Sequence, residues 1–471
     1  MPAALRTRRL RRIITAYSVN RIGFWFGTVA LSLAVFDHTH SGPAVAATML
    51  AAQVIPALAV PFLVARVEAS RRRRELSGLY YFEAAATAVL AVLVLHFWLP
   101  AILLVVALDG TASLAASALM RAETAKAGRE ELAGAAADAE EATAHSRGSG
   151  QQAPPRPPES EQQMTPQSPQ DEDERRAEAA ERQANAALNV AFSVAFVLGP
   201  ALAGVTVAAA GAGVALSIAA AAFLLCGTLL VDLHPHVEEA EGQSVRARLH
   251  AAWWHINRVR DLRSLLVAQA VAFVFFESAA PIEVAYAKAT LRAGDGGFGA
   301  LVAAWGAGVV LGSIIFARSP GRSLRVMVSA GTLAVGTAYV AFGAIGSLAG
   351  ACAAAVLGGI GNGVQWTPLV TAVQRLTPAP LRGRVMGALE SIGALAPALG
   401  LALGGALLAL TSPRTAFFAV GAGALAATAL FARIPMDRPE LHADEEDAEV
   451  RLEPVPAADG GPDAARRSAA L

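Results

Sequence analysis

The sequence predicts an all-α membrane protein whose twelve transmembrane helices form two six-helix bundles. Of the 471 residues, 55% are apolar and only 16% are charged, whereas about a quarter of the residues in soluble proteins are charged. Twelve long apolar runs follow one another along the chain, and one proline-centred motif occurs in each half. Lipid rather than water is therefore expected around most of the chain.

The apolar runs justify the individual helices. A helix needs roughly 20 mostly apolar residues to cross about 30 Å of hydrocarbon. Runs of this kind occur near residues 13–36, 43–65, 76–97, 100–120, 185–208, 211–231, 264–285, 297–317, 325–346, 347–372, 385–410 and 412–432. A Gly-rich break near residues 343–350 divides the ninth run from the tenth.

The division into two bundles follows from an internal repeat. The run 198–204 reads Leu-Gly-Pro-Ala-Leu-Ala-Gly, and the run 395–400 reads Leu-Ala-Pro-Ala-Leu-Gly. Each is followed by a short break and a further apolar run. Two copies of one helical hairpin, one in each half, predict a protein built by duplication within a membrane.

Small residues accompany both copies of this motif. Glycine and alanine let transmembrane helices approach closely. We therefore interpret Gly199, Pro200, Gly204 and Pro397 as packing and bending positions rather than binding residues.

Arginine placement predicts the orientation. Cytoplasmic loops of membrane proteins carry the excess of Lys and Arg. One set of loops is rich in arginine, whereas the opposite set offers only Lys288, Arg292 and Arg414. The rich set is therefore expected inside a cytoplasmic membrane, with both termini cytoplasmic. It contains Arg6, Arg8, Arg9, Arg11, Arg12, Arg66, Arg71 to Arg74, Arg318, Arg322, Arg325, Arg375, Arg382 and Arg384.

The remaining polar stretches define the domain organisation. The linker has arginines alternating with apolar residues at helical spacing, which is typical of a helix on the inner membrane surface. The polar insertion is expected to be a solvated spacer, with a regulatory domain as the alternative. The expected segments are a cytoplasmic N-terminus (1–12), an N-terminal bundle (13–231) containing the insertion (121–183), a linker (232–263), a C-terminal bundle (264–432) and a disordered cytoplasmic tail (433–471).

Four short motifs carry a resemblance to a known family. Over residues 10–433 the chain resembles transporters of the major facilitator superfamily, and in particular its efflux branch. The family's fifth-helix motif is associated with exchange of substrate for protons. The matching stretches are Asn20 to Gly23, Val64 to Arg74, Gly199-Pro200 with Gly204, and Leu381 to Val385.

The resemblance also implies gating residues. The loop after the second helix has Glu68 where the family pattern has Asp. By analogy with the family, Glu68, Arg71 and Arg72 contact the inner end of the eleventh helix and latch one transport state. Glu390 is expected to join that latch. Glu83, near the inner end of the third helix, is expected to reach towards the arginines of the same loops.

Ionisable residues at membrane depth are functional candidates because burying them is costly. At 1.5 Å per residue, Arg21 and Asp109 lie roughly 12 and 16 Å from the inner face. In the resembling family their helices line a central cavity. One hypothesis is that Asp109 binds a proton when Arg21 moves away and releases it when Arg21 returns. The alternative is a static ion pair.

Three further residues are candidates for the cavity. Glu277, on another cavity-lining helix of the family, is expected to bind a cationic substrate or a proton, or else to be a satisfied internal carboxylate. Asn362 and Gln365 precede Pro368, which frees a backbone carbonyl. They are expected either to line the cavity or to hydrogen-bond the backbone carbonyl freed at the kink.

Together these patterns predict a secondary active transporter that exports a small organic molecule in exchange for protons by alternating access. A proton symporter for uptake and a non-transporting scaffold or sensor are the open alternatives. The chain has no G-x-x-x-x-G-K-[ST] phosphate loop. We therefore expect no ATP motor. Enzyme activity, a cofactor and a metal are not expected either, because the sequence offers no other pattern typical of them. The expected partners are a small-molecule substrate, protons and membrane lipid, with no nucleic acid, around a monomer.

Overall fold

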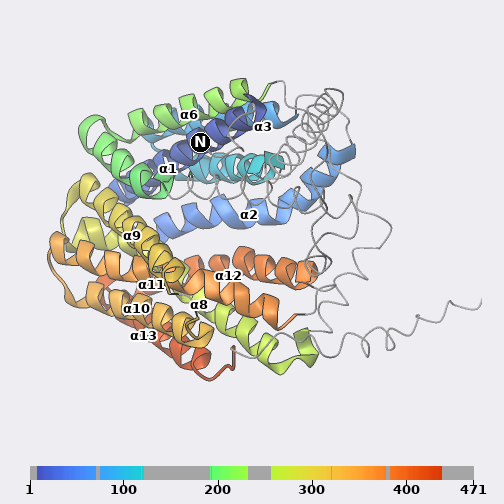
Figure 1. Cartoon of the computed structure of the whole chain (residues 1–471). Coiled ribbons are helices and arrows are strands. Elements are labelled where there is room, and N and C mark those ends of the chain that lie inside the picture. Colours follow the sequence, from blue (N-terminus) through green and yellow to red (C-terminus); the bar gives the residue numbers. More distant parts are fainter. Residues whose placement is uncertain are drawn as a thin grey trace, which may run out of the picture.

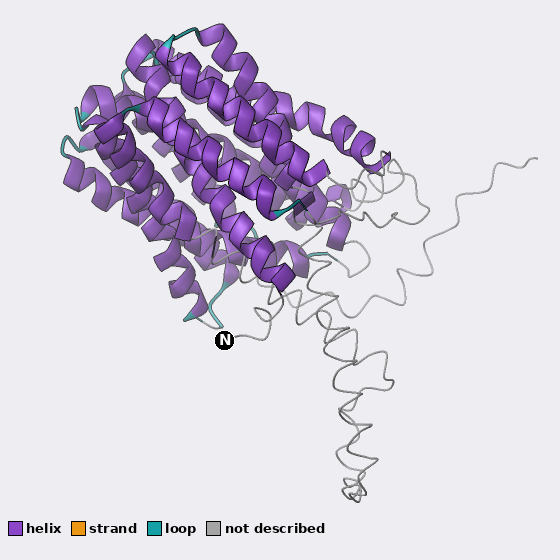
Figure 2. Ribbon diagram, turned by 90° about the horizontal axis from the view of Figure 1, so that it is seen from above, coloured by secondary structure: helices purple, strands orange, loops and turns teal. Residues whose placement is uncertain are grey.

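The computed structural model describes residues 8–69, 75–117, 119–120, 191, 194–231, 256–319, 321–377 and 382–436. All regular structure in these ranges is helical (Figure 2). The N-terminal part comprises α1 (Arg8–Thr39), α2 (Gly42–Ala69), α3 (Glu75–Leu95), a fourth helix (Leu99–Ser117), a fifth helix (Val194–Ala210) and α6 (Ala212–Leu229). The C-terminal part comprises α8 (Arg260–Ala285), the π-helical turn η3 (Tyr286–Thr290), α9 (Gly294–Ala317), α10 (Leu324–Ala344), α11 (Leu348–Arg375), α12 (Arg382–Leu410) and α13 (Pro413–Phe431).

The predicted all-α membrane architecture is confirmed. Within the described ranges, nine helices are long and apolar enough to cross a membrane. Three shorter apolar helices, Gly42–Val54, Val194–Ala210 and Leu395–Leu410, coincide with the other three predicted runs. Each predicted run therefore corresponds to an apolar helix, and many large apolar side chains on these helices point outward, as expected for surfaces that face lipid.

The helices form two groups that lie one above the other in Figure 1, with α1, α2, α3 and α6 on one side and α8 to α13 on the other. In the first group α6 packs against α1 and α3. In the second, α11 packs between α9 and α10, and α8 packs against α12 and α13. The groups meet where α2 packs against α12 and α8.

The assembly has two distinct ends. The loop end is the end of the molecule where α1 ends, η3 leads into α9 and α13 begins, and the helices there are joined by short turns. The terminal end is the opposite end, where α1 begins and α13 ends. The turn between the fifth helix and α6 is a single residue, Gly211. Its φ of 86° lies in the left-handed region that favours glycine, so this sharp reversal needs a residue without a side chain.

Glycines also bring the C-terminal helices close together. A Cβ on Gly363 or Gly312 would collide with backbone of the facing helix, so α9 and α11 touch through their main chains. Tyr286, Phe342 and Phe417 form an aromatic cluster near the loop end of the same half. These contacts make the C-terminal group a tightly packed unit.

Several predictions concern parts of the chain outside the described residues. These are the insertion 121–183, residues 232–255 of the linker, residues 1–7, and residues 437–471 of the tail. Arg71 and Arg72 also lie outside, and the side chains of Glu68 and Glu390 are not described. The predicted latch at the terminal end therefore stays a prediction.

Candidate functional site

Polar side chains from two antiparallel helices meet inside the N-terminal bundle. The Thr87 hydroxyl of α3 donates a hydrogen bond to Asp109 Oδ1 of the fourth helix at 3.4 Å. The Ser113 hydroxyl hydrogen-bonds the Glu83 carboxyl. A step of four residues along each helix separates the two pairs, which is about 6 Å at 1.5 Å per residue. We call Glu83, Thr87, Asp109 and Ser113 the polar ladder.

Arg21 lies next to this ladder on α1. Its guanidinium donates to Asn20 Oδ1 at 3.0 and 3.2 Å and to Ser117 Oγ at 3.4 Å. It also lies 5.3 Å from the centre of the Phe24 ring, a cation–π distance. Ser117 lies two turns along the fourth helix from Asp109, and Arg21 and Asp109 form no direct ion pair in this conformation. Their pairing across the cavity stays a prediction.

Glu83 belongs to the interior of the bundle. Its side chain is only 1% exposed, and its Oε2 atom has no hydrogen-bond partner. The prediction that it reaches towards the loop arginines is therefore wrong. The reason is the register of the two helices, which places Glu83 one turn from Asp109. The matching four-residue spacings on α3 and the fourth helix were the signal that the sequence offered.

The C-terminal bundle also contains a buried polar contact. The Gln365 amide of α11 donates to the Gln269 carbonyl oxygen of α8 at 3.2 Å, and both side chains are buried. Gln365 is therefore held by a neighbouring helix, and Gln269 is a partner that sequence reasoning did not identify. Asn362 lies one turn earlier on α11 and is partly buried.

Glu277 sits where α8 crosses α12. A Cβ on Gly400 of α12 would lie 2.8 Å from Glu277 Cβ, so the absence of a side chain at Gly400 makes room for this carboxylate. Pro397 is buried one turn earlier in α12. Glu283, further along α8, interacts electrostatically with Glu277 and with Tyr339 of α10.

The glycine-proline motif of the fifth helix lies between the two halves. A Cβ on Gly199 would meet Trp25 Cβ of α1 at 2.7 Å. A Cβ on Gly204 would meet Gly299 Cα of α9 at 2.8 Å, and Gly299 in turn faces the carbonyl oxygen of Pro200. The motif therefore brings the backbone of the fifth helix against the backbone of α9, from the opposite bundle.

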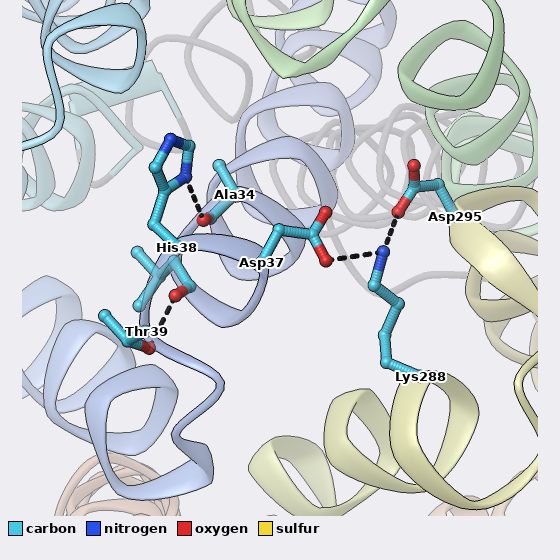
Figure 3. A network of polar contacts seen from close by, with 7 residues as sticks. Ala34, Asp37, His38, Thr39, Lys288 and Asp295 are labelled. Carbon is cyan, nitrogen blue, oxygen red and sulfur yellow. Dashed lines mark hydrogen bonds and ion pairs between the residues drawn. The ribbon is translucent and has the colours of Figure 1, made fainter.

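An ion-pair network also joins the two halves at the loop end. Lys288 Nζ of η3 lies 2.6 Å from Asp37 Oδ1 of α1 and 2.5 Å from Asp295 Oδ1 of α9 (Figure 3). The exposed fractions are 14% for Lys288, 42% for Asp37 and 22% for Asp295. We call these three residues the loop-end latch. One cation of the C-terminal half thus holds an anion of each half.

A cavity of about 810 Å³ lies beside the latch. Asp37, His38 and Asp295 contribute its polar edge, and apolar residues of α1, α3 and α6 form most of its wall. His38 is fixed by a hydrogen bond between its Nδ1 atom and the Ala34 carbonyl oxygen and by stacking on Phe97. Within the described ranges, no three His, Cys, Asp or Glu side chains are placed to hold a metal ion together.

Comparison with known proteins gives the fold a context. Residues 265–461 match the family model described as the Major Facilitator Superfamily. No curated protein matches the chain. Solved structures match nearly all of it at low identity.

A bacterial homologue of the human lysosomal transporter Spinster, in an inward-facing conformation, is 13% identical with a TM-score of 0.59 and covers 92% of this chain and 96% of its own. The nucleoside transporter NupG is 12% identical with a TM-score of 0.60, covering 90% and 98%. A POT family transporter in complex with 5-aminolevulinic acid is 12% identical with a TM-score of 0.62, covering 92% and 97%. The C-terminal half thus matches the Major Facilitator Superfamily, and the chain as a whole has the fold of these membrane transporters.

Proposed function

We propose that this protein is a secondary active transporter of the major facilitator type, which moves a small organic molecule across a membrane by alternating access. The observation that carries the proposal is the loop-end latch. Lys288 and Asp37 belong to different bundles, yet they pair directly at one end of the molecule. A static scaffold has little need of a breakable contact there, whereas a carrier must close and reopen this end.

The fold supports the same conclusion. The fifth helix and α9 touch through Gly204 and Gly299, so two backbones rather than two sets of interlocking side chains form this part of the interface. Such a surface lets one bundle rock against the other. Solved structures with this fold, including the bacterial Spinster homologue, are transporters.

We further propose that the loop end faces the outside of the cell and that the molecule is closed there. The described arginines of the arginine-rich loops, Arg318, Arg322, Arg325 and Arg375, lie at the terminal end, and cytoplasmic loops carry the excess of Lys and Arg. Both termini are then cytoplasmic, and the latch is the external gate of an inward-facing carrier.

Proton-coupled export is the proposed mode of transport. Asp109 releases the coupling proton as Arg21 approaches and binds it again as Arg21 withdraws, while Glu277, Asn362 and Gln365 contribute to the substrate cavity. The buried neighbours Glu83 and Thr87 support this role, because the charge of a carboxyl group in such surroundings depends strongly on nearby charges. The glycine motif of the fifth helix, which resembles that of proton-exchanging exporters, favours export over uptake.

An untargeted measurement tests this function without the choice of a substrate in advance. Small molecules are quantified by mass spectrometry in cells that produce the wild type, the Asp109→Asn variant or no protein, each with and without a protonophore. A proton-coupled exporter depletes one or a few compounds, and both the variant and the protonophore abolish the depletion. Enrichment of those compounds instead indicates uptake by symport, and identical profiles in all cells support the scaffold.

A further inference from the structure

Two carboxyl groups lie close together inside the N-terminal bundle. Glu83 interacts electrostatically with Asp109 and with Arg21. Arg21 is directed to Asn20 and Ser117 and does not bridge the two carboxyl groups. If both were ionised, two negative charges would face one guanidinium. A net charge in such a place is costly, because low-polarity surroundings replace water poorly.

One atom of this cluster lacks a partner. Glu83 is 1% exposed and its Oε2 is buried without a hydrogen bond. A buried polar atom without a hydrogen bond destabilises the folded state, so native proteins rarely contain one without a reason. The Thr87 and Ser113 hydroxyl groups beside the two carboxyl groups offer further oxygen atoms that could bind a cation. Oxygen is the ligand that hard cations prefer.

The remaining neighbours add no further cation to the cluster. Those that interact electrostatically with Glu83 are Tyr80 of α3 and Cys226 of α6. The Tyr80 hydroxyl is directed away, to the sulfur of Met120 at 3.8 Å, and the Cys226 thiol donates to the Ala16 carbonyl oxygen at 3.2 Å. Within the described part of the chain, Arg21 is thus the one positive charge that acts on Glu83, and none acts on Asp109.

From this geometry we propose that Glu83 and Asp109 form one shared site for a single monovalent cation, either a proton or Na⁺. The cation neutralises the second carboxylate and occupies the position that Glu83 Oε2 leaves unsatisfied. Asp109 is the more exposed of the two and forms the entrance, whereas Glu83 forms the buried end. Use of this ion to drive transport rests on the proposed function, but the binding site does not.

Purified full-length protein in detergent provides the test, so transport and substrate are not needed. Infrared difference spectra report protonated carboxyl groups, and thermal denaturation reports ion binding as an upward shift of the unfolding temperature. Both are measured over a pH series in NaCl and in choline chloride at equal ionic strength. The proteins compared are the wild type, Glu83→Gln, Asp109→Asn and the double variant. Glu283→Gln is the matched control, because it removes a carboxyl group of the other bundle.

A shared site predicts an all-or-none result. Each single variant loses the same ion-dependent response as the double variant, and the control retains it. If the occupant is a proton, the response depends on pH and is equal in the two salts. If the occupant is Na⁺, NaCl raises the unfolding temperature at fixed pH and choline chloride does not.

Two outcomes overturn the proposal. Losses in the single variants that add up to the loss in the double variant indicate two independent carboxyl groups. A wild-type response that persists in Glu83→Gln assigns the ion to Asp109 alone. If Glu83→Gln does not fold, Ser113→Ala is used in its place, because it removes a hydroxyl from Glu83 and leaves both carboxyl groups. It is expected to weaken the response, and an unchanged response contradicts the shared site. A protein that binds the ion but moves no compound contradicts the proposed function and leaves the site intact.

Discussion

Lys288 of η3 lies 2.6 Å from Asp37 of α1, and this ion pair connects the two bundles at the loop end. A partly exposed pair of this kind contributes about 0.2–1 kcal/mol. Replacing Lys288 by Ala is therefore expected to shift the population towards conformations open at this end by up to about fivefold.

Labelling of a buried cysteine measures that shift. Ala46 of α2 is buried against Gly405 of α12 near the loop end, so a cysteine at position 46 reacts with a maleimide only when the halves separate. The native Cys226 and Cys352 are first replaced by Ala. The control is Arg414→Gln, which removes a cation of the same half near Gly346. Equal labelling rates in Lys288→Ala and the control would contradict a role for the pair in closure.

The crossing of the fifth helix and α9 provides a second prediction. A Cβ on Gly204 would lie 2.8 Å from Gly299 Cα and 3.0 Å from the Asp295 carbonyl oxygen, and neither backbone atom can move alone. Gly204→Ala should therefore cost about 1–3 kcal/mol through overpacking and should expose position 46 to labelling. Gly27→Ala is the matched control, because its Cβ would meet nothing within 4 Å. The idea fails if both variants behave as the wild type does.

A third prediction concerns the buried glutamine pair. Gln365→Leu leaves Gln269 without its partner at 3.2 Å, which should lower stability by about 1–3 kcal/mol. The double variant Gln269→Leu/Gln365→Leu removes both polar groups and should recover much of the loss. Thermal denaturation of the two variants in one detergent makes the comparison. A double variant that is less stable than Gln365→Leu would indicate that the two glutamines contribute more to stability than their mutual hydrogen bond.

The orientation is tested by labelling from outside intact cells. Thr411 at the loop end and Arg318 at the terminal end are both exposed. With the native cysteines removed, Thr411→Cys should react with a membrane-impermeant maleimide, and Arg318→Cys should react only after the cells are permeabilised. The opposite pattern would invert the assignment of inside and outside.

The helices were predictable because lipid imposes one simple requirement, a sufficiently long apolar segment. Contacts between helices were less accessible to sequence reasoning. Sequence reasoning placed Lys288 at the end of the molecule opposite the arginine-rich loops. It did not identify the partner Asp37, because Asp37 lies on a helix far away in the chain and hydropathy carries no information on such pairing. Glu83 was misplaced because its depth was counted from the end of its own helix. The register against the fourth helix, set by packing, decides its surroundings.

The latch has a further consequence for the energy of opening. Asp295 belongs to the same half as Lys288, so the lysine keeps one counter-ion after the halves part. The carboxylate left behind, Asp37, is already 42% exposed and gains water readily. Neither charge is stranded when the contact breaks, so the two end states differ little in electrostatic free energy. When the closed and open states have nearly equal free energy, even weak binding of a solute to one of them shifts the population between them.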